Sequence, residues 1–255
     1  MSIVSSDIVV YASADMPEDD TSSSGGAIDT ATMVIFTDIA STDNVEIFGE
    51  GGDESKTVVV TGRLASGSED SETITLDASD ATTVVDGTKQ WERILKISSP
   101  NSPAGSITVQ KDGDSGDIVV IPTGISMVRR PFYGATANAT GGADKELYEK
   151  VFIKNEHATL SLLDMQVDET SDPSTFLTFD LEDAVDDNNS LSDRLDSAPT
   201  GMAGSFTSSA KLLTTAGQDD LAAGEAIGVW LNLSLADGTA AAKTTYELTV
   251  TGSST

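Results

Sequence analysis

Short runs of β-branched and aromatic residues, each bounded by turn-forming residues, are the feature that most constrains the fold of this chain of 255 residues. Residues 57–61 and 118–121 are typical of such runs, with Val, Ile and Thr dominant and Gly- or Asp-rich turns nearby. Residues 73–76 and 107–109 alternate apolar with polar side chains, as strands with one buried face do. The pattern predicts an all-β protein. The other expected strands are residues 8–11, 33–36, 45–48, 176–179, 226–235 and 246–250, with short helices as an alternative at 90–97 and 219–223.

An internal repeat predicts how these strands are organised. The sequence Gly-Gly-Ala at residues 25–27 precedes Ile35-Phe36, and Gly-Gly-Ala at residues 141–143 precedes Val151-Phe152, with the copies 116 residues apart. A repeat of this length indicates duplication of a whole sandwich-sized unit. We therefore expect two tandem β-sandwiches, immunoglobulin-like or jelly-roll-like.

The break between the two domains is expected where the strand pattern is interrupted. Pro131 and the Gly-rich residues 134–142 follow the last strand of the first half, and such segments mark domain boundaries. The predicted domains are residues 1–130, with an amino-terminal arm, and residues 131–255.

The charge balance excludes several classes of partner. The chain has 42 acidic and 14 basic residues, a net charge of −28 and a pI near 4.1. Such a surface repels nucleic acid and anionic membranes, because phosphate binding needs clustered Lys and Arg. Two explanations for the acidic excess stay open: a well-solvated surface, or adaptation to high salt, where counterions screen the repulsion. The start of the chain has no secretory pattern and no apolar run is long enough for a membrane helix, so we expect synthesis in the cytoplasm without a membrane anchor.

The residues needed for common catalytic sites are missing or isolated. The absence of cysteine excludes disulfides, zinc–thiolate sites and thiol nucleophiles. His157 is the only histidine, and its neighbours predict an ordinary turn residue. Neither a G-x-S-x-G elbow nor a phosphate-binding glycine loop follows a strand. We expect a protein that is not an enzyme.

One acidic turn has the spacing of a calcium loop. Asp112, Asp114 and Asp117 alternate with small residues, and Ca²⁺ binds six to eight oxygen ligands on such turns. The bidentate Glu of an EF-hand loop is missing, so a solvated acidic loop is the competing interpretation here, as it is for the acidic residues 15–20 and 183–189. Calcium is the one cofactor that the sequence suggests.

Trp230 is the candidate interface residue of the second half. Ile227, Val229, Leu231, Leu233 and Leu235 share one parity, which places Trp230 on the opposite face of its strand. Three interpretations are open: burial under a loop, an interface anchor, or a platform for sugar stacking together with Trp91 and Tyr133.

Several segments resemble virion structural proteins of tailed phages. The resemblance begins with a hairpin formed by residues 57–63 and 72–76, with Ser66-Gly67 between them. Residues 84–88, with Trp91 in the aromatic place, and then residues 105–109 continue it. Residues 221–231 and the final strand resemble the carboxyl end of these proteins.

The resemblance implies a subunit that acts by adding strands or sandwich edges to its neighbours. Its partners would be the major capsid protein or other virion subunits, and copies of itself, with no nucleic acid and no membrane. We expect a capsid decoration or cement protein; a neck or tail protein and a carbohydrate-binding or adhesion module are the alternatives. We expect the amino-terminal arm to pair with another subunit's sheet, through the apolar residues Ile8, Val9, Val10 and Tyr11.

Overall fold

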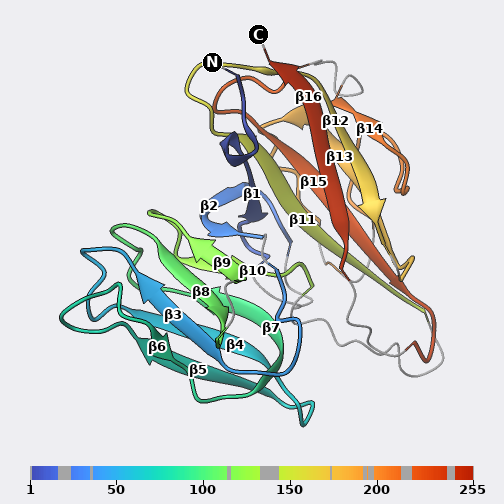
Figure 1. The fold of residues 1–255 in the computed structure, drawn as a ribbon. Helices are drawn as coiled ribbons and strands as arrows, with labels where there is room; N and C mark the ends of the chain where they lie inside the picture. Colours follow the sequence, from blue (N-terminus) through green and yellow to red (C-terminus); the bar gives the residue numbers. More distant parts are fainter. Residues whose placement is uncertain are drawn as a thin grey trace. The chain divides into compact units, whose positions relative to one another are not determined.

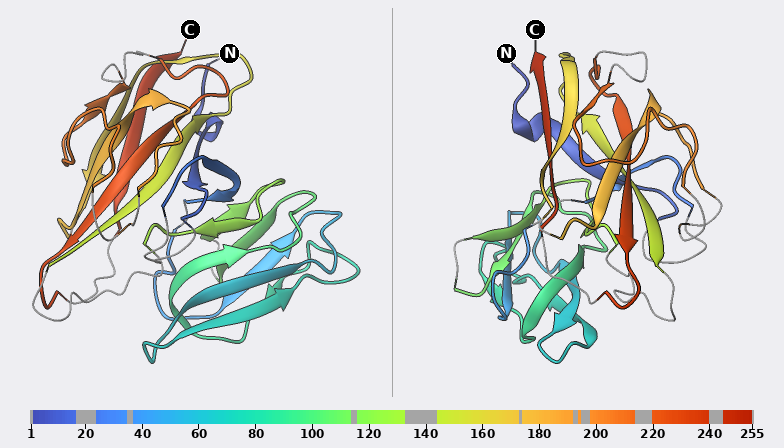
Figure 2. Two further views of the ribbon diagram at one scale, coloured as in Figure 1. Left: turned by 180° about the vertical axis from the view of Figure 1, so that it is seen from behind. Right: turned by 90° about the vertical axis from the view of Figure 1, so that its right-hand side faces the viewer.

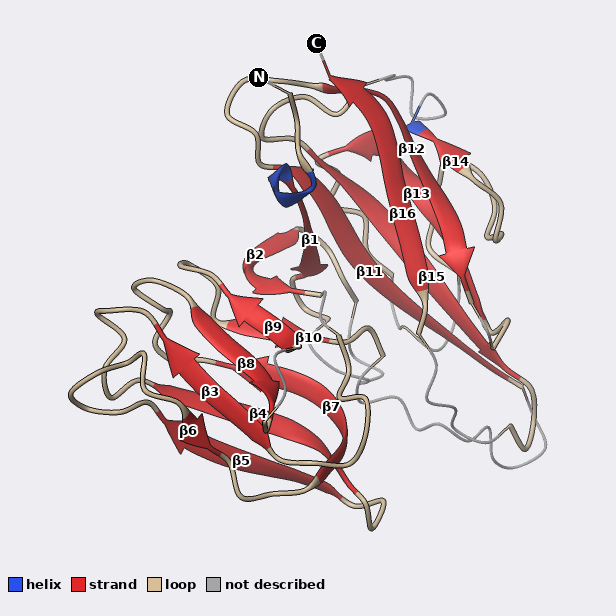
Figure 3. Cartoon of the chain, in the orientation of Figure 1, coloured by secondary structure: helices blue, strands red, loops and turns tan. Residues whose placement is uncertain are grey.

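The fold is all-β, as predicted. The computed structural model describes residues 2–16, 24–34, 37–113, 116–132, 144–172, 174–191, 194, 198–213, 220–239 and 245–254. Strands account for nearly all of its regular structure, and η1 (Ser5–Asp7) is a single short 3-10 turn (Figure 3). No helix within these ranges is long and apolar enough to cross a membrane.

The strands follow one another at short intervals along the chain (Figure 1). They are β1 (Ile8–Ser13), β2 (Ile28–Met33), β3 (Val45–Gly49), β4 (Thr57–Leu64), β5 (Glu69–Thr75), β6 (Val85–Asp86), β7 (Trp91–Ser98), β8 (Ile107–Lys111), β9 (Asp117–Ile121), β10 (Met127–Arg129), β11 (Lys145–Asn155), β12 (Leu162–Ser171), β13 (Leu177–Val185), β14 (Lys211–Leu212), β15 (Ala226–Leu235) and β16 (Glu247–Ser254).

The chain divides into two compact units. Unit 1 combines Met1–Asp29 with Gly134–Thr255, and unit 2 is Thr30–Tyr133. The boundary after Tyr133 lies beside the expected break at Pro131. The first 29 residues, however, belong to the same unit as the carboxyl-terminal half, which differs from the predicted domain of residues 1–130. The reason is that β1 pairs with β11 over five residues.

Unit 1 is a sandwich of two sheets. The larger sheet has the order β13-β15-β11-β1 and the smaller one the order β14-β12-β16 (Figure 2). Val151 is paired with Val229, and Leu181 also lies beside Val229, so these three apolar side chains share one face of the larger sheet. They are almost completely buried, as are Met165 and Val167 of β12 in the smaller sheet. This apolar layer is the core of unit 1.

Unit 2 is a second sandwich with its own core. Its larger sheet has the order β2-β10-β7-β4-β5, and its smaller sheet has the order β6-β3-β8-β9. Val58 and Val60 of β4, which lie in the β-branched run predicted as a strand, alternate with half-buried residues. They are fully buried, like Val45 and Ile47 of β3 and Trp91 of β7.

The two units repeat one strand order. In both, most successive strands alternate between the larger and the smaller sheet, the exceptions being β1 and β11, β4 and β5, and β8 and β9. Apart from the additional β9, the smaller sheets β6-β3-β8 and β14-β12-β16 correspond strand for strand. In the larger sheets, β4-β7 and β2 correspond to β13-β15 and β11, with β10 inserted beside β2. A duplicated sandwich would have this arrangement. Duplication itself stays a prediction, and residues 35–36 and 141–143, on which it was based, lie outside the described residues.

The main error in the strand predictions concerns the alternative helices. The alternative of a short helix at residues 90–97 is wrong, because Trp91–Ser98 forms β7. Residues 220–223 are likewise not helical, since Leu221 makes an isolated bridge with Leu162. The strand expected at residues 33–36 ends at Met33 as part of β2, and residues 35–36 lie outside the described ranges.

Candidate functional site

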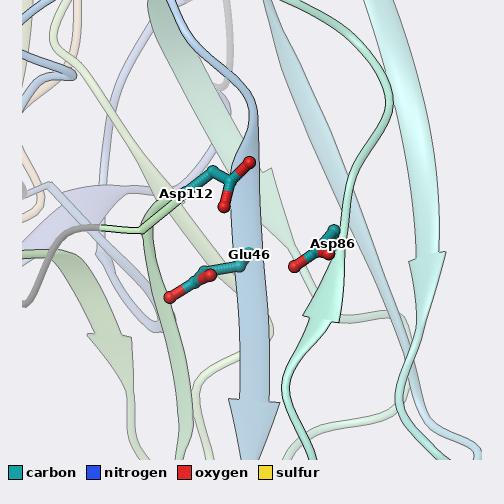
Figure 4. A group of neighbouring side chains, drawn as sticks. All are labelled: Glu46, Asp86 and Asp112. Carbon is teal, nitrogen blue, oxygen red and sulfur yellow. The ribbon is translucent and has the colours of Figure 1, made fainter.

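A cluster of three carboxylates crosses the smaller sheet of unit 2. Glu46 on β3 is in register with Asp86 on β6, and Asp112 follows the end of β8 on the other side of β3. The nearest carboxylate oxygens of the three residues all lie within 4.8 Å of one another, and Figure 4 shows the three side chains gathered over β3. Oxygen ligands at this spacing are suited to Ca²⁺, which takes six to eight of them.

Glu46 is the buried member of the cluster. Val45 and Ile47 point into the core, so the alternation of β3 places Glu46 on the outer face, where it is nevertheless only 9% exposed. One carboxylate oxygen accepts a hydrogen bond from the Gln110 side chain, and the other lies 3.4 Å from the Gly113 amide. The turn after β8 therefore packs against Glu46 and brings Asp112 beside it.

The predicted calcium loop is only partly described. Asp112 takes part in the cluster, but the carboxylates that it joins there, Glu46 and Asp86, come from β3 and β6 and not from its own turn. Asp114 lies outside the described residues, and Asp117 is described only as the first residue of β9. The sequence signal that was missed is Glu46 itself, a charged residue inside the apolar run of β3.

A second buried polar cluster lies on the outer face of the larger sheet in unit 1. The Lys150 Nζ is 2.6 Å from the Glu182 Oε1, and both side chains are fully buried. Nζ also donates to the carbonyl oxygens of Gly26, Asp187 and Asn189 at 3.0–3.2 Å. It lies over the ring of Phe152, 4.6 Å from the centroid. The ammonium group thus fastens two loops, residues 24–27 and 186–190, to the sheet.

Burial perturbs both members of this pair. Desolvation raises the pKa of Glu182 from its ordinary value of 4.5 to about 7, although hydrogen bonds from Lys150 and Trp230 oppose the shift. Desolvation lowers the pKa of Lys150, against the attraction of Glu182 and Asp187. The second carboxylate oxygen of Glu182 is buried without a hydrogen-bond partner. Because the pair is closed off from water, we interpret it as a latch that holds the loops in place.

Trp230 belongs to this latch, and the interface-anchor interpretation of Trp230 is wrong. Its side chain is 0% exposed and packs in a cluster with Met16, Tyr148 and Leu191 of the same chain. The indole Nε1 donates to Glu182 at 3.3 Å. Gly25 has a φ of +72°, which favours glycine, and a Cβ there would lie 3.1 Å from the Trp230 ring. The loops that bury Trp230 lie far from it in the sequence, so the parity of β15 could place the residue on the outer face but could not show that the face is covered.

The predicted amino-terminal arm is also not free. Ile8, Val9, Val10 and Tyr11 lie in β1 and pair with Asn155, Lys154, Ile153 and Phe152 of β11. The Tyr11 hydroxyl donates to Glu156 at 3.0 Å, and burial together with Glu156 raises the pKa of Tyr11 to about 12. The backbone groups that would have joined another subunit's sheet are therefore used within the chain.

The remaining candidate residues either contribute to the fold or lie outside the described residues. The His157 Nδ1 accepts hydrogen bonds from the amides of Thr159 and Leu160, at 3.1 and 2.9 Å, so this side chain stabilises a turn. Trp91 is 0% exposed and cannot stack on a sugar, and Tyr133 lies outside the described residues.

No protein-family model, curated protein or solved structure matches this chain.

Proposed function

We propose that the chain is a structural subunit of a tailed-virus particle, most suited to a place on the capsid surface as a decoration or cement protein. The observation that carries the proposal is the place of the virion-like segment in the fold. Residues 57–76 form the hairpin β4–β5 at the end of the larger sheet of unit 2, and the segments that continue the resemblance lie in the same sandwich. A hairpin at a sheet edge can add to a neighbouring subunit.

The acidic composition is compatible with an outer layer of a particle. A net charge of −28 keeps a concentrated protein soluble and repels nucleic acid, which disfavours a position facing packaged DNA. The neck or tail remains the second position within the same proposal, and a subunit of that kind should form rings alone.

Immunogold electron microscopy tests the proposal directly. An antibody against the purified chain should label particles concentrated from cultures of the source, and the pattern of gold over capsid or tail distinguishes the two positions. Label confined to cell surfaces would instead favour an adhesion module. Neither Trp91 nor Trp230 can stack on a sugar in an adhesion module, since both are buried. Binding of the chain to sugars on a glycan array would be the evidence for that alternative.

A further inference from the structure

Unit 2 carries a basic face in a chain that is otherwise strongly acidic. Arg63 on β4 is in register with Arg93 on β7, and Lys96 on β7 is in register with Arg129 on β10. Residues in register on adjacent strands point to the same side of a sheet. These four side chains therefore lie on one side of the larger sheet, opposite the side on which Val60 and Ile97 are buried. Arg129 is itself only 1% exposed, so Arg63, Arg93 and Lys96 are the partly exposed members of the face.

The local balance of charge on this basic face is the reverse of that of the whole chain. The acidic neighbours are Glu69, in register with Arg63, and Asp38 and Glu92, which act electrostatically on Arg93. Arg130 adds a further partly exposed basic group and pairs with Asp38 at 3.0 Å. Without the buried Arg129, four basic residues thus stand against three acidic ones in the described part of the face, in a chain whose acidic residues outnumber its basic ones by 42 to 14.

Two of the arginines have capacity for further carboxylates. Among the described residues, neither Arg63 nor Arg93 has a carboxylate oxygen at ion-pair distance. Arg93 is half-buried, its Nε has no hydrogen-bond partner, and desolvation lowers the pKa of its guanidinium. A guanidinium that is partly desolvated and has no anion beside it is strongly stabilised when a carboxylate binds to it, because the planar groups can form charge-assisted hydrogen bonds.

We propose that Arg63, Arg93 and Lys96 dock onto the acidic surface of unit 1 in a second copy of this chain. Residues 1–29 and 134–255 hold 26 acidic and 6 basic residues, whereas residues 30–133 hold 16 and 8. The net charges are thus −20 and −8, so unit 1 offers the complementary surface. Its exposed acidic side chains include Asp164, Asp183, Asp186, Asp220, Asp237 and Glu247.

A second copy suits this face better than a nucleic acid. A duplex carries one negative charge per ~1.7 Å and would run past the basic face onto acidic surroundings. A folded partner can instead bring a single acidic patch to the face. A single contact of this kind is heterologous and builds rings or open filaments, whereas two reciprocal contacts between unit 2 and unit 1 close a two-fold dimer.

Isotope-mixed cross-linking identifies the contact. We would mix equal amounts of ¹⁴N- and ¹⁵N-labelled chain and treat them with a carbodiimide, which couples a lysine amine to a touching carboxylate. The expected product joins the Lys96 peptide of one isotope to an acidic peptide of unit 1 of the other isotope. Mixed-isotope products that involve Lys89 or Lys145 as often as Lys96 would overturn the proposal.

Light scattering after size exclusion, at ~0.15 M salt, gives the second measurement. The variant Arg63→Gln/Arg93→Gln should associate roughly tenfold more weakly than the native chain, since removing favourable charges at a contact costs on the order of 1.4 kcal/mol, a tenfold change in the dissociation constant. The control Lys89→Gln/Lys145→Gln changes the net charge by the same amount and should associate like the native chain. Circular dichroism establishes that both variants are folded.

The outcomes separate this inference from the proposed function, on which it rests only for its biological setting. Equal association of the two variants would exclude the basic face. A native chain that stays monomeric up to its solubility limit would exclude a second copy as the partner. Either result leaves the immunogold test of a virion position unaffected. If gold labels the particles while the purified chain is monomeric, the partner of the basic face is an acidic protein other than this chain.

Discussion

Lys150 and Glu182 form a buried ion pair although their strands are not neighbours in the sheet. β15 lies between β11 and β13, and the two side chains meet above it at 2.6 Å. Gly228 makes this possible, because Phe152 is paired with Gly228 and a Cβ at that glycine would lie 2.1 Å from the Glu182 Oε2. Because Gly228 on β15 has no side chain, the Glu182 carboxylate can occupy the space above this strand and reach Lys150.

Breaking this pair should be costly. We expect Lys150→Met to lower the free energy of unfolding by about 3–5 kcal/mol, because Glu182 is then left as a buried carboxylate without a cation or has to take up a proton. Lys150→Met/Glu182→Leu should recover only part of the loss, since three loop carbonyls still lack the donor that Lys150 supplies. Urea unfolding measures both. Lys154→Met is the matched control, because the Lys154–Glu156 pair is partly exposed and such pairs contribute at most about 1 kcal/mol. Equal costs for Lys150→Met and Lys154→Met would contradict the latch.

Glu182 should also give the protein a distinct pH dependence. Its pKa in the folded chain is about 7, above the ordinary 4.5, so its protonated form is favoured by folding. The contribution of protonated Glu182 to the free energy of unfolding is fully present below pH ~4.5 and is lost as the pH rises to about 7. Two nearby charges also act on the pKa of Glu182: Lys150 lowers it and Asp187 raises it.

The measurement is the difference in Tm between the native chain and Glu182→Gln across pH 4 to 9. The other 41 acidic residues titrate in both proteins and largely cancel. We expect the native chain to lose stability relative to Glu182→Gln between pH 4.5 and 7, with a constant difference above pH 8. A difference that is flat over the whole range would show that Glu182 titrates like an exposed carboxyl.

The strands were predictable where alternation was regular, and β7 shows why the prediction failed elsewhere. Gly62 is in register with Ile94, and Arg63 with Arg93, but the pairing shifts on either side of them. These irregularities displace Glu92 and Leu95 from the simple alternation. Trp91, Ile94, Leu95 and Ile97 are consequently buried, and three of them, Trp91, Ile94 and Ile97, follow a three-residue spacing that is also found in helices. A sequence pattern cannot reveal a bulge that is set by the partner strand.

The candidate sites were less predictable because they join distant segments. The acidic turn was recognisable in the sequence, but Asp112 meets Glu46 and Asp86 only because β6, β3 and β8 are adjacent in the sheet. Arg63 and Arg93 are brought together by the same kind of register. Strand order depends on the global packing of the sandwich, and the local pattern contains little information about it.

Removing β1 should damage the fold of unit 1. We expect deletion of residues 2–13 to lower the Tm and to cause aggregation, because it exposes the backbone of residues 151–155 on β11 as an open edge and removes the buried Ala12. Deletion of residues 2–4 alone, which lie before η1, is the control and should leave the Tm nearly unchanged. A folded, soluble chain without residues 2–13 would mean that the segment is dispensable and would restore the idea of a free arm.

Calcium should stabilise unit 2 through the Glu46–Asp86–Asp112 cluster. Without calcium the three carboxylates repel one another, so Asp86→Asn or Asp112→Asn should raise the Tm slightly in chelator. With calcium the native chain should gain about 1.4 kcal/mol at ten times the dissociation constant, and the two variants should gain much less. Asp183→Asn, at an exposed position on β13, serves as the control and should keep the full response. Thermal unfolding in chelator and in millimolar Ca²⁺, each at constant ionic strength, separates ion binding from general screening of the acidic surface. If the native chain and all three variants respond equally, the acidic turn is a solvated loop and the calcium prediction is wrong.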